Sequence, residues 1–220
     1  MEQQPRCPVR RLQMRRLQLS KPWTAIFILL ALSALAQSID PMPVARSADS
    51  YAIYSLLMPG NPFASMPPEQ NKRWAIADAT IGIADMNPAI PPEGQLKAPP
   101  ENVNAFREAV HDFNLRKNGR IQLTPHFQLS HDYTLMTATQ VNEFRHARGS
   151  VHANSDLKDK YAGYPGITFF SQVYFNDAQT AALVYMNNWC ANLCSAGTWV
   201  YLEKHGGQWV RRSGITTRMQ

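Results

Sequence analysis

The chain has 220 residues, of which 22 are Lys or Arg and 16 are Asp or Glu, so its formal net charge at pH 7 is +6. The basic excess lies at the start: residues 1–36 hold six of the basic residues and one of the acidic residues. Without them the chain has 16 basic and 15 acidic residues, a balance that gives no electrostatic footprint for nucleic acid or anionic lipid.

Residues 1–36 have the build of a secretory signal peptide. Basic residues precede an uncharged apolar run from Trp23 to Ala36, which ends in the small-x-small sequence Ala34-Leu35-Ala36. The run has 14 residues, fewer than the roughly 20 that a membrane-spanning helix needs. We therefore expect secretion to the periplasm or the extracellular space, cleavage after Ala36 and no stable membrane span afterwards. An uncleaved membrane anchor is the alternative.

Two details of export stay open. Met14, followed by Arg15-Arg16, would begin a signal peptide of ordinary length, so it competes with Met1 as the start. The arginine pair also resembles a twin-arginine signal but lacks the aromatic residue two positions later, which favours export of the unfolded chain.

The rest of the chain is long enough for one domain with a core of its own. Residues 37–46 hold two prolines and no periodicity, which indicates a flexible leader before a single α+β domain at 47–220. Ser47 or Asp49 could cap a first helix that runs to Met58.

Residues 59–100 hold nine prolines, which disrupt both helix interiors and sheet ladders. We expect mostly irregular loops on the surface here, with one strand within residues 73–83.

The clearest helix is predicted at residues 101–116, where Val103, Phe106, Val110 and Phe113 form an apolar stripe that suits the core. Further elements are expected in chain order: strands at 120–123 and 133–136, a helix capped by Thr137 or Thr139 that reaches His146, and a polar linker at 148–160.

The last part of the chain predicts an antiparallel meander. Strands are expected at 167–175, 180–186, 198–204 and 208–211, with a turn at 176–179 and positive φ angles at Gly206-Gly207. Apolar residues occupy both alternations, so the middle strands should be covered on both faces. The predicted fold is a curved antiparallel sheet with one main helix packed on it, in an order similar to cystatin-like or scytalone-dehydratase-like cones.

Cys190 and Cys194 predict a structural disulfide, the default for closely spaced cysteines in an exported protein. The ring is small, so its entropic effect should be about 1 to 2 kcal/mol. A catalytic dithiol usually has two intervening residues at a helix start, and a metal site would need ligands that are not nearby.

The six histidines show no metalloprotease spacing, and the sequence contains no phosphate loop or nucleophile elbow. We therefore expect no metal and no cofactor. If the protein is an enzyme, the general bases to test are His131 with Asp132, His111 with Asp112, and Glu143.

Large aromatic residues are concentrated in the meander. They indicate either a packed core or a binding surface around the cysteine loop. The candidate binding residues of such a surface are Tyr185, Trp189, Trp199 and Tyr201.

Residues 164–212 also resemble a group of exported bacterial proteins of unknown function. The resemblance rests on Val173-Tyr174-Phe175-Asn176, Ala182-Leu183-Val184-Tyr185, the cysteine pair with Gly197, Leu202-Glu203-Lys204 and Gly207-Gln208-Trp209-Val210. Ala191 and Ser195 depart from the group, where glycines often follow the cysteines. The resemblance implies no activity.

The leading hypothesis is a non-enzymatic exported protein that binds a ligand or an envelope protein through the aromatic, disulfide-fixed loop. The alternative is a small hydrolase or lyase that uses His131 or His111 in a concave sheet. Neither the ligand nor the oligomeric state follows from the sequence.

Overall fold

The structure, a computed structural model, describes residues 38–60, 72–191 and 194–212. They all belong to one folded unit, Gln37–Gln220. The predicted signal peptide and its cleavage site lie outside the described residues, as do Pro62, Pro67 and Pro68 of the proline-rich segment.

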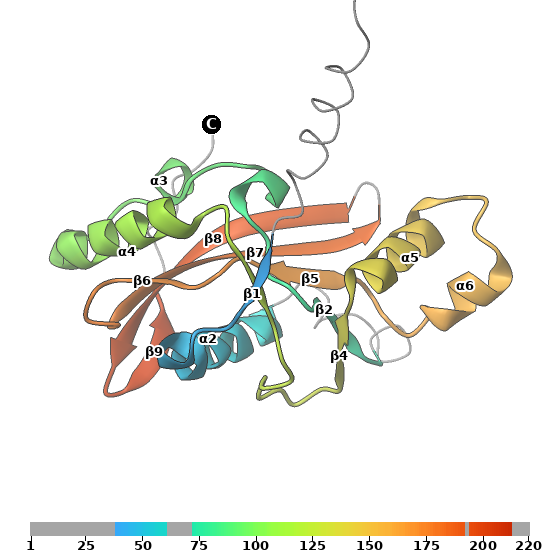
Figure 1. Cartoon of the computed structure of the whole chain (residues 1–220), viewed down its shortest axis with the longest axis horizontal. Coiled ribbons are helices and arrows are strands. Elements are labelled where there is room, and N and C mark those ends of the chain that lie inside the picture. Colours follow the sequence, from blue (N-terminus) through green and yellow to red (C-terminus); the bar gives the residue numbers. More distant parts are fainter. Residues whose placement is uncertain (1–37, 61–71, 192–193, 213–220) are drawn as a thin grey trace, which may run out of the picture. The chain divides into compact units, whose positions relative to one another are not determined.

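A seven-stranded mixed sheet forms the centre of the unit (Figure 1). In spatial order its strands are β4 (Tyr133–Met136), β2 (Trp74–Ala77), β5 (Ile167–Phe170), β7 (Ala181–Ala191), β8 (Cys194–His205) and β9 (Gln208–Arg211), and β6 (Tyr174–Phe175) pairs with β7. The C-terminal meander β7-β8-β9 is antiparallel, as predicted. Gly206 and Gly207 have φ angles of 56° and 83°, which confirms the turn between β8 and β9.

The sheet is not antiparallel throughout, which corrects the sequence prediction. β2 pairs in parallel with both β4 and β5. Helical segments separate these strands along the chain, and such long connections allow parallel pairing. A separate parallel pair joins β1 (Ile39–Pro41) to β3 (Arg120–Gln122).

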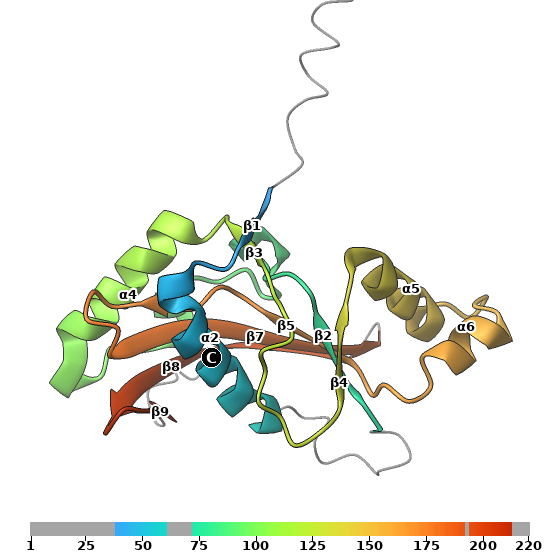
Figure 2. The ribbon, with the colours of Figure 1, turned by 60° about the horizontal axis from the view of Figure 1, so that its bottom comes forward.

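Helices cover both faces of the sheet, and Figures 1 and 2 show α4 and α2 on opposite sides of it. One core contains Phe106 and Phe113 of α4 (Val103–Arg116) and Phe144 of α5 (Ala138–Gly149). The other contains Ile53 and Tyr54 of α2 (Val44–Leu57). The prediction that the middle strands are covered on both faces is confirmed, although α2 was not expected to be the second cover.

The stripe of the predicted helix 101–116 packs as expected. Phe106, Val110 and Phe113 are buried in the core, while Val103 is half-buried at the helix start. A short 3₁₀ turn, η4 (Pro100–Asn102), precedes α4. At α5 the structure selects Thr137 over Thr139 as the cap, because the Thr137 hydroxyl accepts from the backbone N–H of Gln140.

The first helix differs from the prediction. It begins at Val44 after Pro43, and neither Ser47 nor Asp49 caps it. The Asp49 carboxylate instead accepts hydrogen bonds from Lys204 Nζ and Trp209 Nε1, both at 2.8 Å. The segment expected as a flexible leader thus contains strand β1 and the start of α2, because pairing with β3 fixes residues 39–41.

Two further segments are more ordered than predicted. The polar linker at 148–160 contains α6 (Ser155–Lys160), which Asn154 caps through its side chain. The proline-rich segment forms β2 as expected, together with η1 (Met58–Gly60), η3 (Ile83–Asp85) and α3 (Pro92–Gln95). Met86 and Leu96 are each only 4% exposed, so this part covers the sheet rather than forming surface loops alone.

Candidate functional site

A pocket of about 300 Å³ opens on the α4–α5 face of the sheet, and we call it the α5 pocket. Side chains of β2, β5 and β7 line its floor, namely Ala77, Phe169, Asn187 and Trp189. One wall is α5, with Ala138, Val141, Asn142 and Arg145. The opposite wall combines Ile39 of β1, Arg120 of β3 and the segment from Asp78 to Asn87. This volume is at the small end of the range for ligand pockets.

The parallel strands explain why a pocket forms here. β2 and β4 end side by side, with Ala77 paired to Met136 and the N–H of Asp78 donating to the Met136 carbonyl. The chain then turns at Thr137 into α5, so the carboxyl edge of the two strands and the first half of the helix bound the same space. The small side chains of Ala77 and Ala79 leave this space unfilled.

Arg145 of α5 lies over the aromatic floor. Its guanidinium carbon is 5.2 Å from the ring centre of Phe169 and 5.8 Å from that of Trp189. These contacts are cation–π interactions, which orient the guanidinium without using its N–H groups. Within the described ranges, no carboxylate lies within ion-pair distance of Arg145.

The opposite wall carries charges of both signs. Arg120 Nε donates to the Thr80 carbonyl at 3.1 Å, which holds this side chain at the wall. The carboxylates of Asp78 and Asp85 make no hydrogen bond or ion pair with any residue that the structure describes. The pocket therefore combines a largely apolar floor with charged groups that form no ion pairs with one another.

Asn187 supplies a buried polar group at the floor. It is 6% exposed, and its side-chain oxygen accepts from the Ser195 hydroxyl at 3.1 Å. Ser195 also lines the pocket and pairs across the hairpin with Trp189. The end of the β7–β8 hairpin is thus part of the site.

Cys190 and Cys194 form a disulfide at this hairpin end, with their Cα atoms 5.3 Å apart. The two cysteines belong to β7 and β8 rather than to a loop, because both strands extend further than the sequence predicted. Each cysteine is adjacent in sequence to a pocket residue, Trp189 or Ser195. The disulfide closes the hairpin beside the pocket.

Only one of the four predicted binding aromatics reaches the pocket, and it is Trp189. Tyr185, Trp199 and Tyr201 are at most 1% exposed, so they are core residues and offer no binding surface. The proline-rich segment covers two of them: the Tyr185 hydroxyl donates to the Asn87 carbonyl at 2.6 Å, and Trp199 Nε1 donates to the Ile90 carbonyl at 2.8 Å. Tyr201 packs against Phe106 of α4, with ring centres 5.4 Å apart. Because the proline-rich segment was expected to form surface loops, nothing in the sequence indicated that it buries Tyr185 and Trp199.

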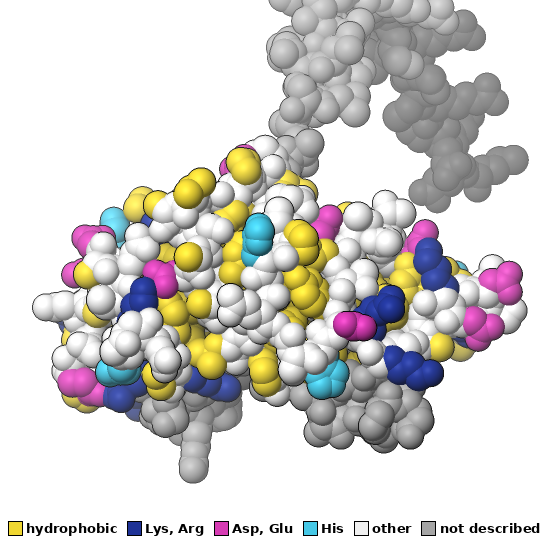
Figure 3. Space-filling view, turned by 90° about the horizontal axis from the view of Figure 1, so that it is seen from below, with side chains coloured by type: hydrophobic (Ala, Val, Ile, Leu, Met, Phe, Trp, Pro, Cys, Tyr) yellow, Lys and Arg dark blue, Asp and Glu magenta, His cyan; other side chains and the backbone are white. Residues whose placement is uncertain are grey.

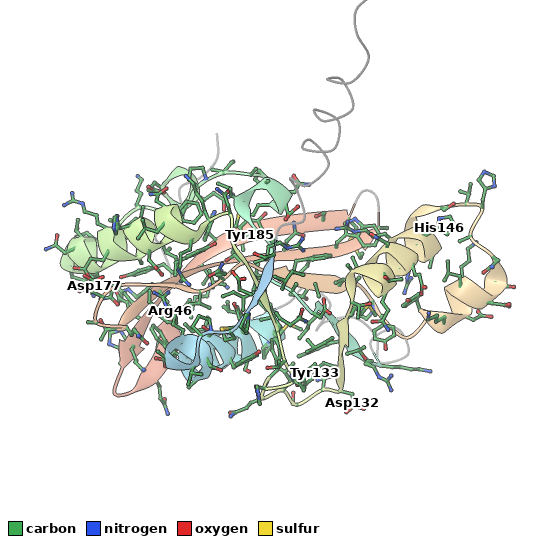
Figure 4. The ribbon with its side chains drawn as sticks, viewed as in Figure 1. Arg46, Asp132, Tyr133, His146, Asp177 and Tyr185 are labelled. Atoms are coloured by element: carbon green, nitrogen blue, oxygen red, sulfur yellow. A yellow bond between two sulfur atoms is a disulfide. The ribbon has the colours of Figure 1, made fainter. Side chains whose placement is uncertain are left out.

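The structure does not bring the candidate general bases together, and none of them lines the α5 pocket. His111 is exposed beside a second pocket, and its neighbour Asp112 binds Arg46 and Arg116. Figure 4 shows that Asp132, which precedes β4, lies well separated from Asp177, which follows β6 and lines the second pocket beside His111.

The other two candidates have structural contacts. His131 stacks on Trp74 with ring centres 4.6 Å apart. Glu143 accepts from Lys160 Nζ at 2.6 Å and from the Tyr161 hydroxyl at 2.8 Å, and these hydrogen bonds lower its pKa. Among the described residues, the one histidine–carboxylate pair within 4 Å is His205 with Glu203, which lines none of these pockets. The enzyme alternative stays a prediction.

Sequence reasoning missed the polar residues of the α5 pocket, which are Asp78, Asp85, Asn87, Arg120, Asn142, Arg145, Asn187 and Ser195. They come from separate segments and form no motif. One signal was present: Asn187-Asn188 follow an apolar strand, and the strand continues through them. Buried amides need hydrogen-bond partners, so such a pair indicates a polar site.

Three further findings bear on the class of protein. In the described part of the chain, no group of three or more His, Cys, Asp or Glu residues is placed to hold a metal ion. No helix of that part combines the length and the apolar character needed to cross a membrane. Comparison of the chain with family models, with curated proteins and with solved structures finds no match.

Proposed function

We propose that the protein is exported and binds a small organic ligand in the α5 pocket, without catalysing a reaction. The observation that carries this proposal is the pocket itself: a concave site with an aromatic floor, a buried amide and charged side chains free to meet a ligand. Pockets of this composition are the usual sites of small-molecule binding.

The position of the pocket supports the proposal. Its floor consists of strand residues and one wall is a capped helix, so the lining is held in place before any ligand arrives. Preformed sites lose less conformational entropy on binding. The disulfide at the hairpin end adds to this by fixing the backbone next to Trp189.

The test combines ligand identification with a variant that closes the pocket. Protein purified from its native envelope fraction is analysed by native mass spectrometry, and the bound small molecule is extracted and identified. Asn142→Trp places a large side chain at an exposed position that lines the pocket. We expect this variant to lose the bound molecule while it keeps its melting temperature.

Asn104→Trp is the matched control, because Asn104 is an exposed asparagine on α4 outside the pocket. The control should retain the ligand. Equal ligand content in the two variants, or no small molecule on the wild-type protein, would contradict the proposal.

A further inference from the structure

We infer that the ligand of the α5 pocket is a small dipolar molecule, with an anionic and a cationic group on an apolar body, of the class of aromatic amino acids and short peptides. The inference deepens the proposed function and rests on it. It follows from where the two signs of charge lie in the pocket.

The two charged walls differ in the sign of their net charge. The α5 wall carries one cation, Arg145, whereas the opposite wall carries Asp78, Asp85 and Arg120, which sum to one negative charge. Arg145 and Asp85 are exposed and Asp78 and Arg120 are half-buried, so a bound ligand displaces part of the water around these groups. A charge that loses water without gaining a partner is unfavourable. A ligand with a single charge would compensate one wall and leave the other unpaired. A dipolar ligand compensates both.

Arg145 is suited to the anionic end of such a ligand. The guanidinium rests over the Phe169 and Trp189 rings, so its position is restricted while its N–H groups remain available. An arginine held in this way can donate two parallel hydrogen bonds to a carboxylate. The cationic end would then face Asp78 and Asp85 on the opposite wall.

The floor indicates the body of the ligand. Phe169 and Trp189 present aromatic surface, and Ala77 presents a small apolar side chain beside them. A ring in the ligand can pack against this surface with an offset or edge-on geometry. The volume of about 300 Å³ suits a molecule of the size of an aromatic amino acid or a dipeptide better than a long chain.

The inference is tested with four probes that share a phenyl ring and differ in charge: phenylalanine, glycyl-phenylalanine, 3-phenylpropionate and phenethylamine. Binding to the protein purified without residues 1–36, with native ligand removed, is measured by isothermal titration calorimetry. We expect at least one of the two dipolar probes to bind about tenfold tighter than either singly charged probe.

Two variants assign the ends of the ligand. Arg145→Gln should lower the affinity for the tighter dipolar probe and for 3-phenylpropionate about tenfold and leave the affinity for phenethylamine unchanged. Asp78→Asn should lower the affinity for the tighter dipolar probe and for phenethylamine and leave that for 3-phenylpropionate unchanged. Arg107→Gln and Asp159→Asn are charge-matched controls at exposed positions outside the pocket, and they should change none of the affinities.

The outcomes separate this inference from the proposed function. A singly charged probe that binds as tightly as the best dipolar probe, or no binding by any of the four, overturns the dipolar inference. In either case the proposed function still stands if Asn142→Trp removes the molecule that copurifies with the wild-type protein. If Asn142→Trp keeps that molecule, the proposed function itself fails.

Discussion

Asp112 joins two helices and a strand through one carboxylate. It accepts hydrogen bonds from Arg46 of α2 at 2.7 and 3.2 Å, from Arg116 one turn further along α4 at 2.7 and 2.9 Å, and from the backbone N–H of Phe175 in β6 at 2.9 Å. The sequence suggested Asp112 as a partner of His111 in general-base catalysis. These five hydrogen bonds give it a structural role.

Replacing this carboxylate should destabilise the fold. We expect Asp112→Asn to lower the free energy of unfolding by about 2 to 4 kcal/mol, because two half-buried arginines lose their counter-charge. Urea denaturation followed by circular dichroism measures the change. Asp159→Asn on the exposed face of α6 is the control, with an expected change within about 0.5 kcal/mol. Equal values for the two variants would contradict the structural role.

The same carboxylate gives the stability a dependence on pH. Burial alone would raise the pKa of Asp112, but the hydrogen bonds from Arg46, Arg116 and Phe175 outweigh it and hold the pKa below its ordinary value. The stabilisation is therefore complete above the unfolded pKa of about 3.9 and is lost as the pH falls through the lower folded value. The wild-type stability should fall more steeply below pH 4 than that of Asp112→Asn, as urea titrations at several pH values would show.

At the scale of single elements, Thr137 decides where α5 begins. Its hydroxyl accepts from the Gln140 N–H, and the Gln140 side chain accepts from the Thr137 N–H at 2.9 Å, which is a capping box. We expect Thr137→Ala to lower the free energy of unfolding, measured by thermal denaturation, by about 1 kcal/mol. Thr139→Ala, two residues later on the exposed side of the helix, should lower the free energy of unfolding by less than half as much. The reverse order would show that the cap does not form in solution.

The disulfide acts on the hairpin more than on the whole fold. Its ring is short, so Cys190→Ser with Cys194→Ser should lower the free energy of unfolding by only about 1 to 2 kcal/mol. Ligand affinity should fall several-fold, because Trp189 and Ser195 next to the bond line the pocket. Calorimetry on the double variant measures both effects, and reduced wild-type protein should behave in the same way. An unchanged ligand affinity would show that the disulfide does not contribute to binding in the pocket.

Element prediction worked where local chemistry decides the structure. Interactions within a few residues determine three predicted features, which are the cap at Thr137, the stripe from Phe106 to Phe113 and the turn at Gly206-Gly207. It failed where distant pairing decides: residues 39–41 form a strand only because Arg120–Gln122 lie beside them. The parallel pairing of β2 has the same cause, since its partners are 59 and 92 residues away in the registers Trp74–Tyr133 and Ala75–Ile167.

At the scale of the whole molecule, acidic and basic side chains are interspersed on the face that Figure 3 shows. Figure 3 shows acidic and basic side chains together at the end formed by α5 and α6, where Glu143 pairs with Lys160. This fits the near balance of charge expected for the chain without residues 1–36. The α5 pocket was not predictable at this scale, because Asp78 and Arg145 come to line one pocket only after three parallel strands and a helix have assembled.

The fold also bears on where the predicted export signal would be cut. Ile39 pairs with Arg120 and lines the α5 pocket, so a mature chain that begins after Asp40 would lose strand β1 and part of the wall. Cleavage after Ala36 keeps both. We therefore expect the protein purified from the envelope or the medium to begin at Gln37, as N-terminal sequencing or intact-mass measurement would show.

Variants at the cleavage site make this test specific. Signal peptidase requires a small residue at the position before the cut, so Ala36→Lys should leave uncleaved precursor in the membrane fraction, whereas Ala36→Ser should be processed like the wild type. The folded unit is the same in both variants because it begins after position 36. Wild-type protein that retains residues 1–36 after export would instead identify the apolar run as an anchor and place the pocket at a membrane surface.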